Sequence, residues 1–247
     1  MRFFRIVDAV AVPGVLILTW VMLFLSYDIS TAGSIAALIG FGFVAALYVA
    51  FRELRAHAAA SRMASHGDPD ELMAHADREL KRRFTRRGRA PFHIYRSIAH
   101  QLRGDWTAAK QSLADAGLDE IPPRRRRMWT LFHGTQQINV LAALDDAAGA
   151  RRVLEETVRP TARMIRGAGI EVMVREAEAR VLLAEGKFEE ARPLFEQLAR
   201  DVRLGASTRA LCKYYAGQCY AVRDAESARV ARAEAAKLAP KTWLARA

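Results

Sequence analysis

The stretch EAEARVLLAEGKFEEARPLFEQL, residues 176–198, decides the expected fold of this chain. Apolar side chains recur at helical spacing on both sides of Gly186 and Lys187, so the stretch predicts two helices joined by a tight turn. Ala191 stands early in the second helix, where a small side chain lets two helices pack closely. Phe195 follows one turn later, where a bulky side chain fills the gap to the next pair. The stretch therefore predicts a closely packed helix pair.

The same pattern occurs four times along the chain. In each case a tight polar turn is followed by an alanine, five residues after the first residue of the turn. The aligned alanines, spaced by 41, 41 and 37 residues, are Ala109, Ala150, Ala191 and Ala228. One helix pair cannot bury its apolar face alone, whereas a stack of pairs can. Because no stretch after residue 51 alternates convincingly as a strand would, we expect an all-α fold, with about four helix pairs stacked as an α-solenoid.

These repeats resemble the tetratricopeptide repeat family, whose helix-turn-helix unit has about 34 residues. The resemblance covers about residues 90–240. The positions that carry it best are Ala179, Leu182, Leu183, Gly186, Lys187, Phe188, Ala191, Phe195 and Leu198. The repeats here are longer than the family's, and Arg232 stands where the family has a bulky apolar residue. We therefore describe the domain as tetratricopeptide-like.

The resemblance implies that the first helix of each pair lines a concave face, on which a protein or peptide partner binds. The positions that it assigns to this partner-binding groove are Thr135, Asn139, Glu176, Arg180, Lys213 and Tyr220. The family's pattern of Lys, Asn and Arg that clamps a carboxylate is not reproduced across adjacent repeats. A chaperone tail is therefore not implied as the partner.

Two uncharged runs precede the repeats. The first spans 19 residues from Ala9 to Tyr27, and the second spans 23 residues from Ile29 to Phe51. As helices they would be roughly 28 and 34 Å long, against a hydrocarbon core of about 30 Å. The two runs predict a transmembrane hairpin over residues 1–51. The alternatives are a cleaved signal peptide, which has a shorter apolar region, and a buried hairpin, which would show a polar face.

Positive charges flank both predicted spans and are absent between them. Arg2 and Arg5 precede the first span, Arg52 and Arg55 follow the second, and the connecting loop has no Lys or Arg. The positive-inside rule then places both ends of the chain in the cytoplasm. The excess of Arg over Lys is typical of a GC-rich bacterial genome. We therefore expect a multi-pass protein of the bacterial inner membrane with a cytoplasmic C-terminal domain.

The formal charge of +11 belongs to residues 52–247, because the residues up to Phe51 sum to zero. A basic run lies in the juxtamembrane helical segment, residues 52–90, where anionic lipid would attract it. Its members are Lys81, Arg82, Arg83, Arg86, Arg87 and Arg89. The alternative is a solvated helix end. Nucleic acid is not expected as a partner, because no aromatic platform accompanies the charge.

The sequence contains no arrangement that suggests catalysis. Cys212 and Cys219 are seven residues apart on an expected helix, too far for a disulfide, and the six histidines show no metal-site spacing. We expect no enzyme activity, cofactor, metal or small-molecule substrate.

The expected layout is residues 1–51, 52–90, a repeat domain over 91–240, and a C-terminal tail over 241–247. The expected function is that of a membrane-anchored scaffold or adaptor that binds a protein. The alternatives are an accessory subunit of a membrane enzyme or transporter complex, and a basic helical protein that binds anionic lipid or nucleic acid.

Overall fold

The computed structural model describes residues 31–83, 85–221 and 223–246, and these residues form helices and turns without a strand. The expectation of an all-α chain is confirmed for this part. The helices are α3 (Thr31–His66), α4 (Pro69–Arg82), α5 (Arg86–Arg103), α6 (Trp106–Ala114), α7 (Pro123–Ala143), α8 (Ala147–Val153), α9 (Arg159–Arg163), α10 (Ala168–Ala184), α11 (Phe188–Arg200), α12 (Ala206–Tyr220) and α13 (Ala225–Leu238). Shorter turns are η2 (Leu118–Glu120), η3 (Leu154–Val158) and η4 (Trp243–Arg246).

The chain divides into two compact units, Met1–His57 and Ala58–Ala247, and α3 contributes to both. Among the residues that the structure describes, no helix combines the length and the apolar character needed to cross a membrane. The first predicted span, Ala9 to Tyr27, lies outside the described residues. The second, Ile29 to Phe51, overlaps α3 and receives no support from that result.

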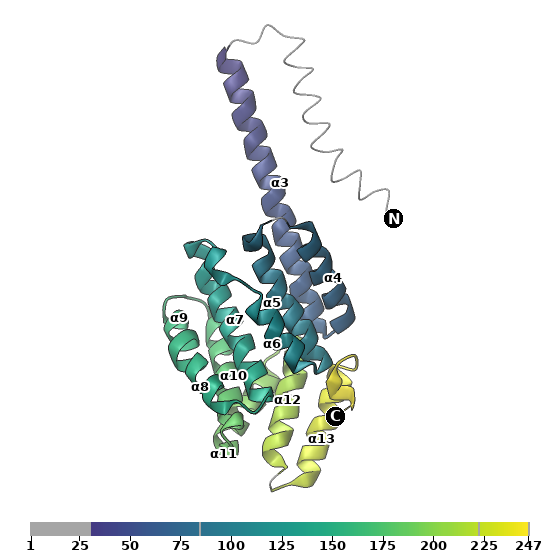
Figure 1. Ribbon diagram of the computed structural model, residues 1–247. Helices are drawn as coiled ribbons and strands as arrows, with labels where there is room; N and C mark the ends of the chain where they lie inside the picture. The colour runs from purple at the N-terminus through teal and green to yellow at the C-terminus, as the bar shows by residue number, and fades with distance from the viewer. Residues whose placement is uncertain (1–30, 84, 222, 247) are drawn as a thin grey trace. The chain divides into compact units, whose positions relative to one another are not determined.

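The second unit consists of paired helices (Figure 1), whose ends are set by polar caps and left-handed turns. Asp68 accepts a hydrogen bond from the backbone N–H of Glu71 and so caps α4. The turns before α6 and α11 use Gly104 at φ 83° and Gly186 at φ 74°. The second repeat has no glycine there, and Asp145 adopts the same conformation at φ 60°. Asp tolerates this region better than most residues, so the turn is retained.

The four aligned alanines occupy equivalent, buried positions. Each lies on the second helix of a pair, and the exposed fraction is 0% for Ala109, Ala150 and Ala191 and 3% for Ala228. Their partners in the pairs are α5, α7, α10 and α12, which pack against α6, α8, α11 and α13. The expected role of the alanines in close helix packing is therefore confirmed.

The second helix of the second pair is interrupted, which the sequence pattern did not predict. A π-helical turn, Leu154–Val158, separates α8 from α9. Pro160 lies in the first turn of α9 and has no N–H with which to continue the α-helical ladder. The wider turn keeps Leu154 and Val158 fully buried against α7.

The last residues of the second unit pack against its first residues. The Ser207 hydroxyl donates to the carbonyl of Ala64 at 2.6 Å, and Lys241 forms an ion pair with Asp68. The ring of Trp243 lies 5.9 Å from that of Trp106 in an edge-to-face arrangement. The residues predicted to be a C-terminal tail thus form η4 and close the series of helices.

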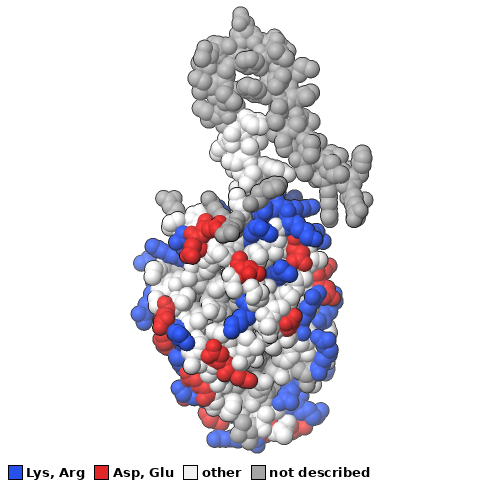
Figure 2. Space-filling model, in the orientation of Figure 1, with Lys and Arg blue, Asp and Glu red and all other residues white. Residues whose placement is uncertain are grey.

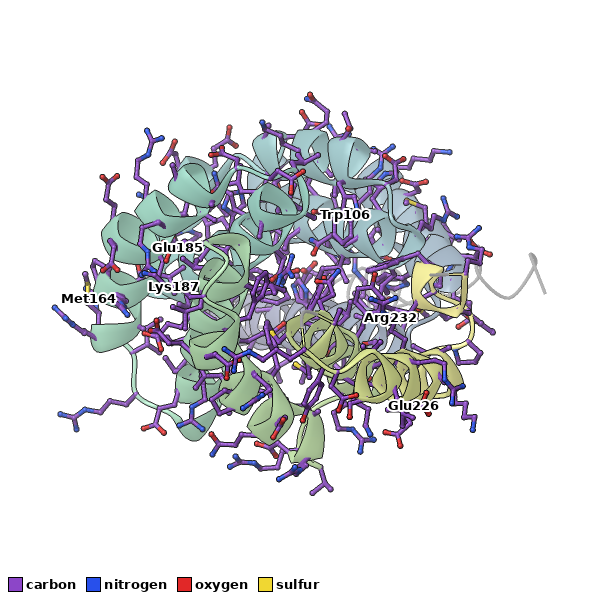
Figure 3. The ribbon with its side chains drawn as sticks, turned by 90° about the horizontal axis from the view of Figure 1, so that it is seen from below. Trp106, Met164, Glu185, Lys187, Glu226 and Arg232 are labelled. Atoms are coloured by element: carbon purple, nitrogen blue, oxygen red, sulfur yellow. The ribbon has the colours of Figure 1, made fainter. Side chains whose placement is uncertain are left out.

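Viewed from below, the helices of the second unit follow one another around a centre that is filled with side chains (Figure 3). The inward side chains come mainly from the first helix of each pair. The candidate site lies there.

Candidate partner-binding cavity

A cavity of about 480 Å³ opens inside the ring of helices. Its walls come from the end of α3 and from α5, α7, α10 and the start of α12. One set of wall positions, separated by 34, 37 and 35 residues, is Ile98, Phe132, Gly169 and Leu204. A second set with the same separations is Leu102, Gln136, Met173 and Thr208. These separations are shorter than the 41, 41 and 37 residues between the aligned alanines, so successive helix pairs contribute different repeat positions to the wall.

Glu176 on α10 is the one acidic residue among the described residues that line this cavity. Its side chain is only partly exposed. Burial of the carboxyl group raises the pKa of Glu176 to about 7, although the nearby Arg180 charge and a hydrogen bond from Asn139 act in the opposite direction. Loss of hydration is thus the larger effect. At neutral pH the cavity contains a carboxyl group that is close to its point of half ionisation.

Arg180 lies one helical turn beyond Glu176 and is 4% exposed. Its guanidinium carbon is 3.7 Å from the centroid of the Tyr215 ring, and one terminal nitrogen donates to the carbonyl of Asn139 at 3.4 Å. The Nε atom has no hydrogen-bond partner. Among the described residues no carboxylate lies within ion-pair distance of this guanidinium, so stacking on Tyr215 is its main compensation.

A second cavity, of about 470 Å³, includes Arg180 in its wall. Trp106 from α6 and Arg232 from α13, both labelled in Figure 3, also line it, together with Tyr214 and Trp243. The Trp243 ring contacts Tyr214 edge to face, with the ring centroids 4.8 Å apart. The second cavity therefore has two basic residues, Arg180 and Arg232, and one acidic residue, Asp145, among the described residues of its wall.

Asn139 on α7 connects these two regions. Its side chain hydrogen-bonds to Glu176, and its backbone carbonyl accepts from Arg180. A neighbouring amide pair extends the polar wall, because Gln101 donates to Gln136 at 3.2 Å. Gln101 is also 3.3 Å from the Ser97 hydroxyl. The wall therefore carries two polar groupings: Gln101 with Gln136 and Ser97, and Asn139 with Glu176 and Arg180.

The structure brings together some of the expected groove residues and separates others. Thr135, Asn139 and Glu176 line the first cavity, and Arg180 lines the second. The Thr135 hydroxyl donates to the carbonyl of Phe132 at 2.8 Å, so it is already used within its own helix.

Lys213 and Tyr220 lie in neither cavity wall. Lys213 forms an ion pair with Glu234 of α13, and the Tyr220 hydroxyl donates to Glu196 of α11. These two residues therefore join α12 to its neighbours. The inward positions of α12 that the expectation missed include Ser207, Thr208 and Tyr214. The repeat spacing of 37 residues between the last two pairs, counted on from Glu176 and Arg180, gives residues 213 and 217 and so finds none of these three.

The basic run that was expected to face lipid is divided in the structure. Lys81, Arg82 and Arg89 are exposed. Arg83 is buried, forms an ion pair with Glu79 at 3.0 Å and lies over the ring of Phe92 at 4.2 Å. Its charge is thus compensated within the protein. The side chains of Arg86 and Arg87 lie outside the described residues. On the visible face in Figure 2, basic and acidic residues are interspersed.

The described residues contain no group of three or more His, Cys, Asp or Glu that could hold a metal ion. Cys212 and Cys219 are free and buried. What the fold and the cavity define is an all-α protein of paired helices with a polar site at its centre. Comparison with protein-family models, with curated proteins and with solved structures gives no match.

Proposed function

We propose that this protein is a membrane-anchored adaptor whose tetratricopeptide-like domain binds a segment of a partner protein in the Glu176 cavity. The observation that carries the proposal is that the first helices of the four successive pairs, α5, α7, α10 and α12, together line that cavity. A cavity of about 480 Å³ is also within the usual range of ligand sites, about 300–1,000 Å³.

The chemistry of the cavity supports binding more than packing. An interior that served packing alone would be expected to pair its buried polar groups fully. Here burial raises the pKa of the Glu176 carboxyl group, and Arg180, which lines the neighbouring cavity, keeps an Nε atom without a hydrogen-bond partner. A bound segment could supply the missing partners. No ion pair, cofactor or reaction is required for this role.

Support for the membrane anchor comes from the first unit. Among the described residues of α3, large apolar side chains are exposed around the helix, from 41% for Tyr48 to 66% for Leu54. The others are Phe43, Val44, Leu47, Val49 and Phe51. Such a helix is unfavourable in water unless something covers it. We propose that lipid covers this helix, because the uncharged run from Ile29 to Phe51 is long enough to span a bilayer. Charged residues begin again directly after it, at Arg52.

The charge pattern supports a cytoplasmic location for the domain. Arg52, Arg55 and Arg62 follow the proposed span, as the positive-inside rule requires of the cytoplasmic side. Exposed Lys81, Arg82 and Arg89 would add an attraction to anionic lipid of about 1 kcal/mol each if they came near the surface. Lipid contact is thus part of the proposal, secondary to the anchor.

Blocking the cavity tests the proposal. A side chain added at Gly169 would meet no atom within 4 Å of its Cβ position, so Gly169→Trp should fold and fill the cavity rim. Val202, which is 83% exposed and lines no described cavity, provides the matched control Val202→Trp.

Each full-length variant is purified from detergent-solubilised native membranes, and co-purifying proteins are identified by mass spectrometry. We expect one protein to be lost with Gly169→Trp and retained with Val202→Trp. The same set of proteins in both samples would refute a partner site in the cavity. Release of the wild-type chain from membranes by alkali would refute the anchor.

A further inference from the structure

The proposed function leaves open what kind of segment the cavity accepts, and the charges in its wall bear on that question. Among the described residues that line it, two carry a charge: Glu176 and Arg203. Arg203 is bound by Asp201, with a terminal nitrogen 2.6 Å from the Asp201 carboxylate. Glu176 has no Lys, Arg or His partner within 4 Å among the described residues. The cavity thus holds one acidic group without an ion-pair partner within 4 Å, which a hydrogen bond from Asn139 and the nearby charge of Arg180 stabilise only in part.

The rest of the wall suits an aliphatic chain that ends in a hydrogen-bond donor. Ile98, Phe132 and Leu211 provide apolar surface. Gln136 and Asn139 add amide groups to the wall, and Asn139 hydrogen-bonds to the Glu176 carboxyl group. An ammonium group can donate three hydrogen bonds and needs acceptors of this kind. An anionic group would instead meet the Glu176 carboxylate and be repelled.

We propose that the cavity receives the side chain of a lysine from the partner segment, with its ammonium group on the Glu176 carboxylate and its methylene groups along the apolar wall. This inference rests on the proposed function, because it names the chemistry of the segment bound there. The apolar stem of lysine packs against Ile98 and Phe132 while its charge pairs with Glu176. The inference assigns Glu176 to recognition and leaves Arg180, stacked on Tyr215, as a positioning group for Asn139.

The other titratable groups around Glu176 do not compete for this role. Burial raises the pKa values of Cys212 and Tyr215 on α12, so both groups are neutral at physiological pH. The Arg203 guanidinium holds the pKa of Asp201 at about 2, and this pair stays charged throughout the relevant range. The pH dependence of lysine binding should therefore follow Glu176 alone.

Two capped peptides provide the probe. Acetyl-Leu-Lys-Leu-amide carries the ammonium group, and acetyl-Leu-norleucine-Leu-amide has nearly the same shape without it. Affinity for the full-length chain in a non-ionic detergent is measured by calorimetry at pH 6 and pH 8. We expect the lysine peptide to bind at least tenfold more tightly than the norleucine peptide at pH 8. We expect its affinity to fall about tenfold at pH 6, because a carboxyl group of pKa about 7 is then mostly protonated.

Two variants assign the effect to the cavity. Glu176→Gln removes the charge with little change of shape and should abolish both the lysine preference and the pH dependence. Glu171→Gln makes the same change at an exposed position of α10 outside this cavity and should keep both.

Equal affinity for the two peptides, absence of binding by either, or a lysine preference that survives Glu176→Gln would overturn the inference. Hexylammonium tests a different source of the same group. If it bound in a Glu176-dependent manner while the lysine peptide did not, the ligand would be a free amine and the lysine assignment would be wrong. If a partner protein were lost with Gly169→Trp but the two peptides bound equally well, the proposed function would stand and this inference alone would be refuted.

Discussion

Replacing Glu176 with Gln should change how the stability of the protein depends on pH. The carboxyl group has a pKa of about 7 in the folded chain, against an ordinary value of 4.5. Below pH 4.5 the group is protonated whether the chain is folded or unfolded, so it has no effect. Between pH 4.5 and 7 the unfolded chain releases this proton and the folded chain keeps it. The free energy of unfolding therefore falls as pH rises and levels off above pH 7.

The size of this effect follows from the shift of about 2.5 units, the difference between 7 and 4.5. At 1.36 kcal/mol per unit, the shift corresponds to about 3 kcal/mol. The side chain is partly exposed to the cavity, where water can enter, so we expect about 2 kcal/mol. Glutamine has no charge to desolvate. Glu176→Gln should therefore become more stable relative to the wild type by about 2 kcal/mol between pH 4.5 and pH 8.

The assay is urea denaturation of the full-length chain in a non-ionic detergent at intervals from pH 4.5 to 8. The difference between variant and wild type at each pH removes the contributions of all other groups. Glu171→Gln, on the same helix but exposed, is the control and should give a flat difference. A flat difference for Glu176→Gln as well would show that the cavity carboxyl has an ordinary pKa, and would refute the reasoning.

Three further predictions concern the fold. Ala191→Leu should lower the free energy of unfolding by about 1–3 kcal/mol, because Ala191 is fully buried between α10 and α11. The effect is measured as a lower melting temperature. The control Ala225→Leu, at an exposed alanine, should have little effect. Trp243→Ala should lower the free energy of unfolding by about 3 kcal/mol, because the indole ring contacts Trp106 and Tyr214. It should also accelerate amide exchange at both ends of the second unit. Unchanged exchange would contradict the packing of the last helices against earlier ones. Asp145→Val should cost about 1–2 kcal/mol in urea denaturation, and Asp145→Gly should be nearly neutral, since residue 145 has φ 60°; equal costs would contradict the left-handed turn.

Local features of the fold were predictable because they depend on interactions between residues that are close together in the sequence. The alanine at the start of each second helix had to be buried for two helices to approach closely, and all four are. Asp68 followed by Pro69 predicted a helix start, and the structure shows that cap. These features need only the residues within one or two helical turns.

Features that depend on distant contacts were not predictable in the same way. The residues after Pro240 gave no periodic pattern, yet Leu244 is 3% exposed and Trp243 reaches Trp106. Nothing in the local sequence indicates that the last helices return to the first. The closure of the ring depends on the small rotation between successive helix pairs, summed over the whole domain.

The candidate site could be predicted from the sequence only in part. Asn139 and Glu176 were expected on the inward face, and both line the first cavity. Lys213 and Tyr220 were expected on that face, but they pair with Glu234 and Glu196 between helices. A shift of one residue in a helix rotates a side chain by about 100°, which is enough to move it from the cavity to an adjoining contact.

The most direct test of the account is a photo-crosslink from the cavity in intact native membranes. A photoreactive benzoylphenylalanine replaces Gly169, at the cavity wall where the backbone has room for a side chain, and in a second sample replaces exposed Val202. The account predicts that irradiation joins the Gly169 sample to one partner protein, in the membrane fraction, and that the Val202 sample lacks this product. If the Gly169 sample gave no product, or the same products as Val202, the cavity would not be where this protein holds a partner.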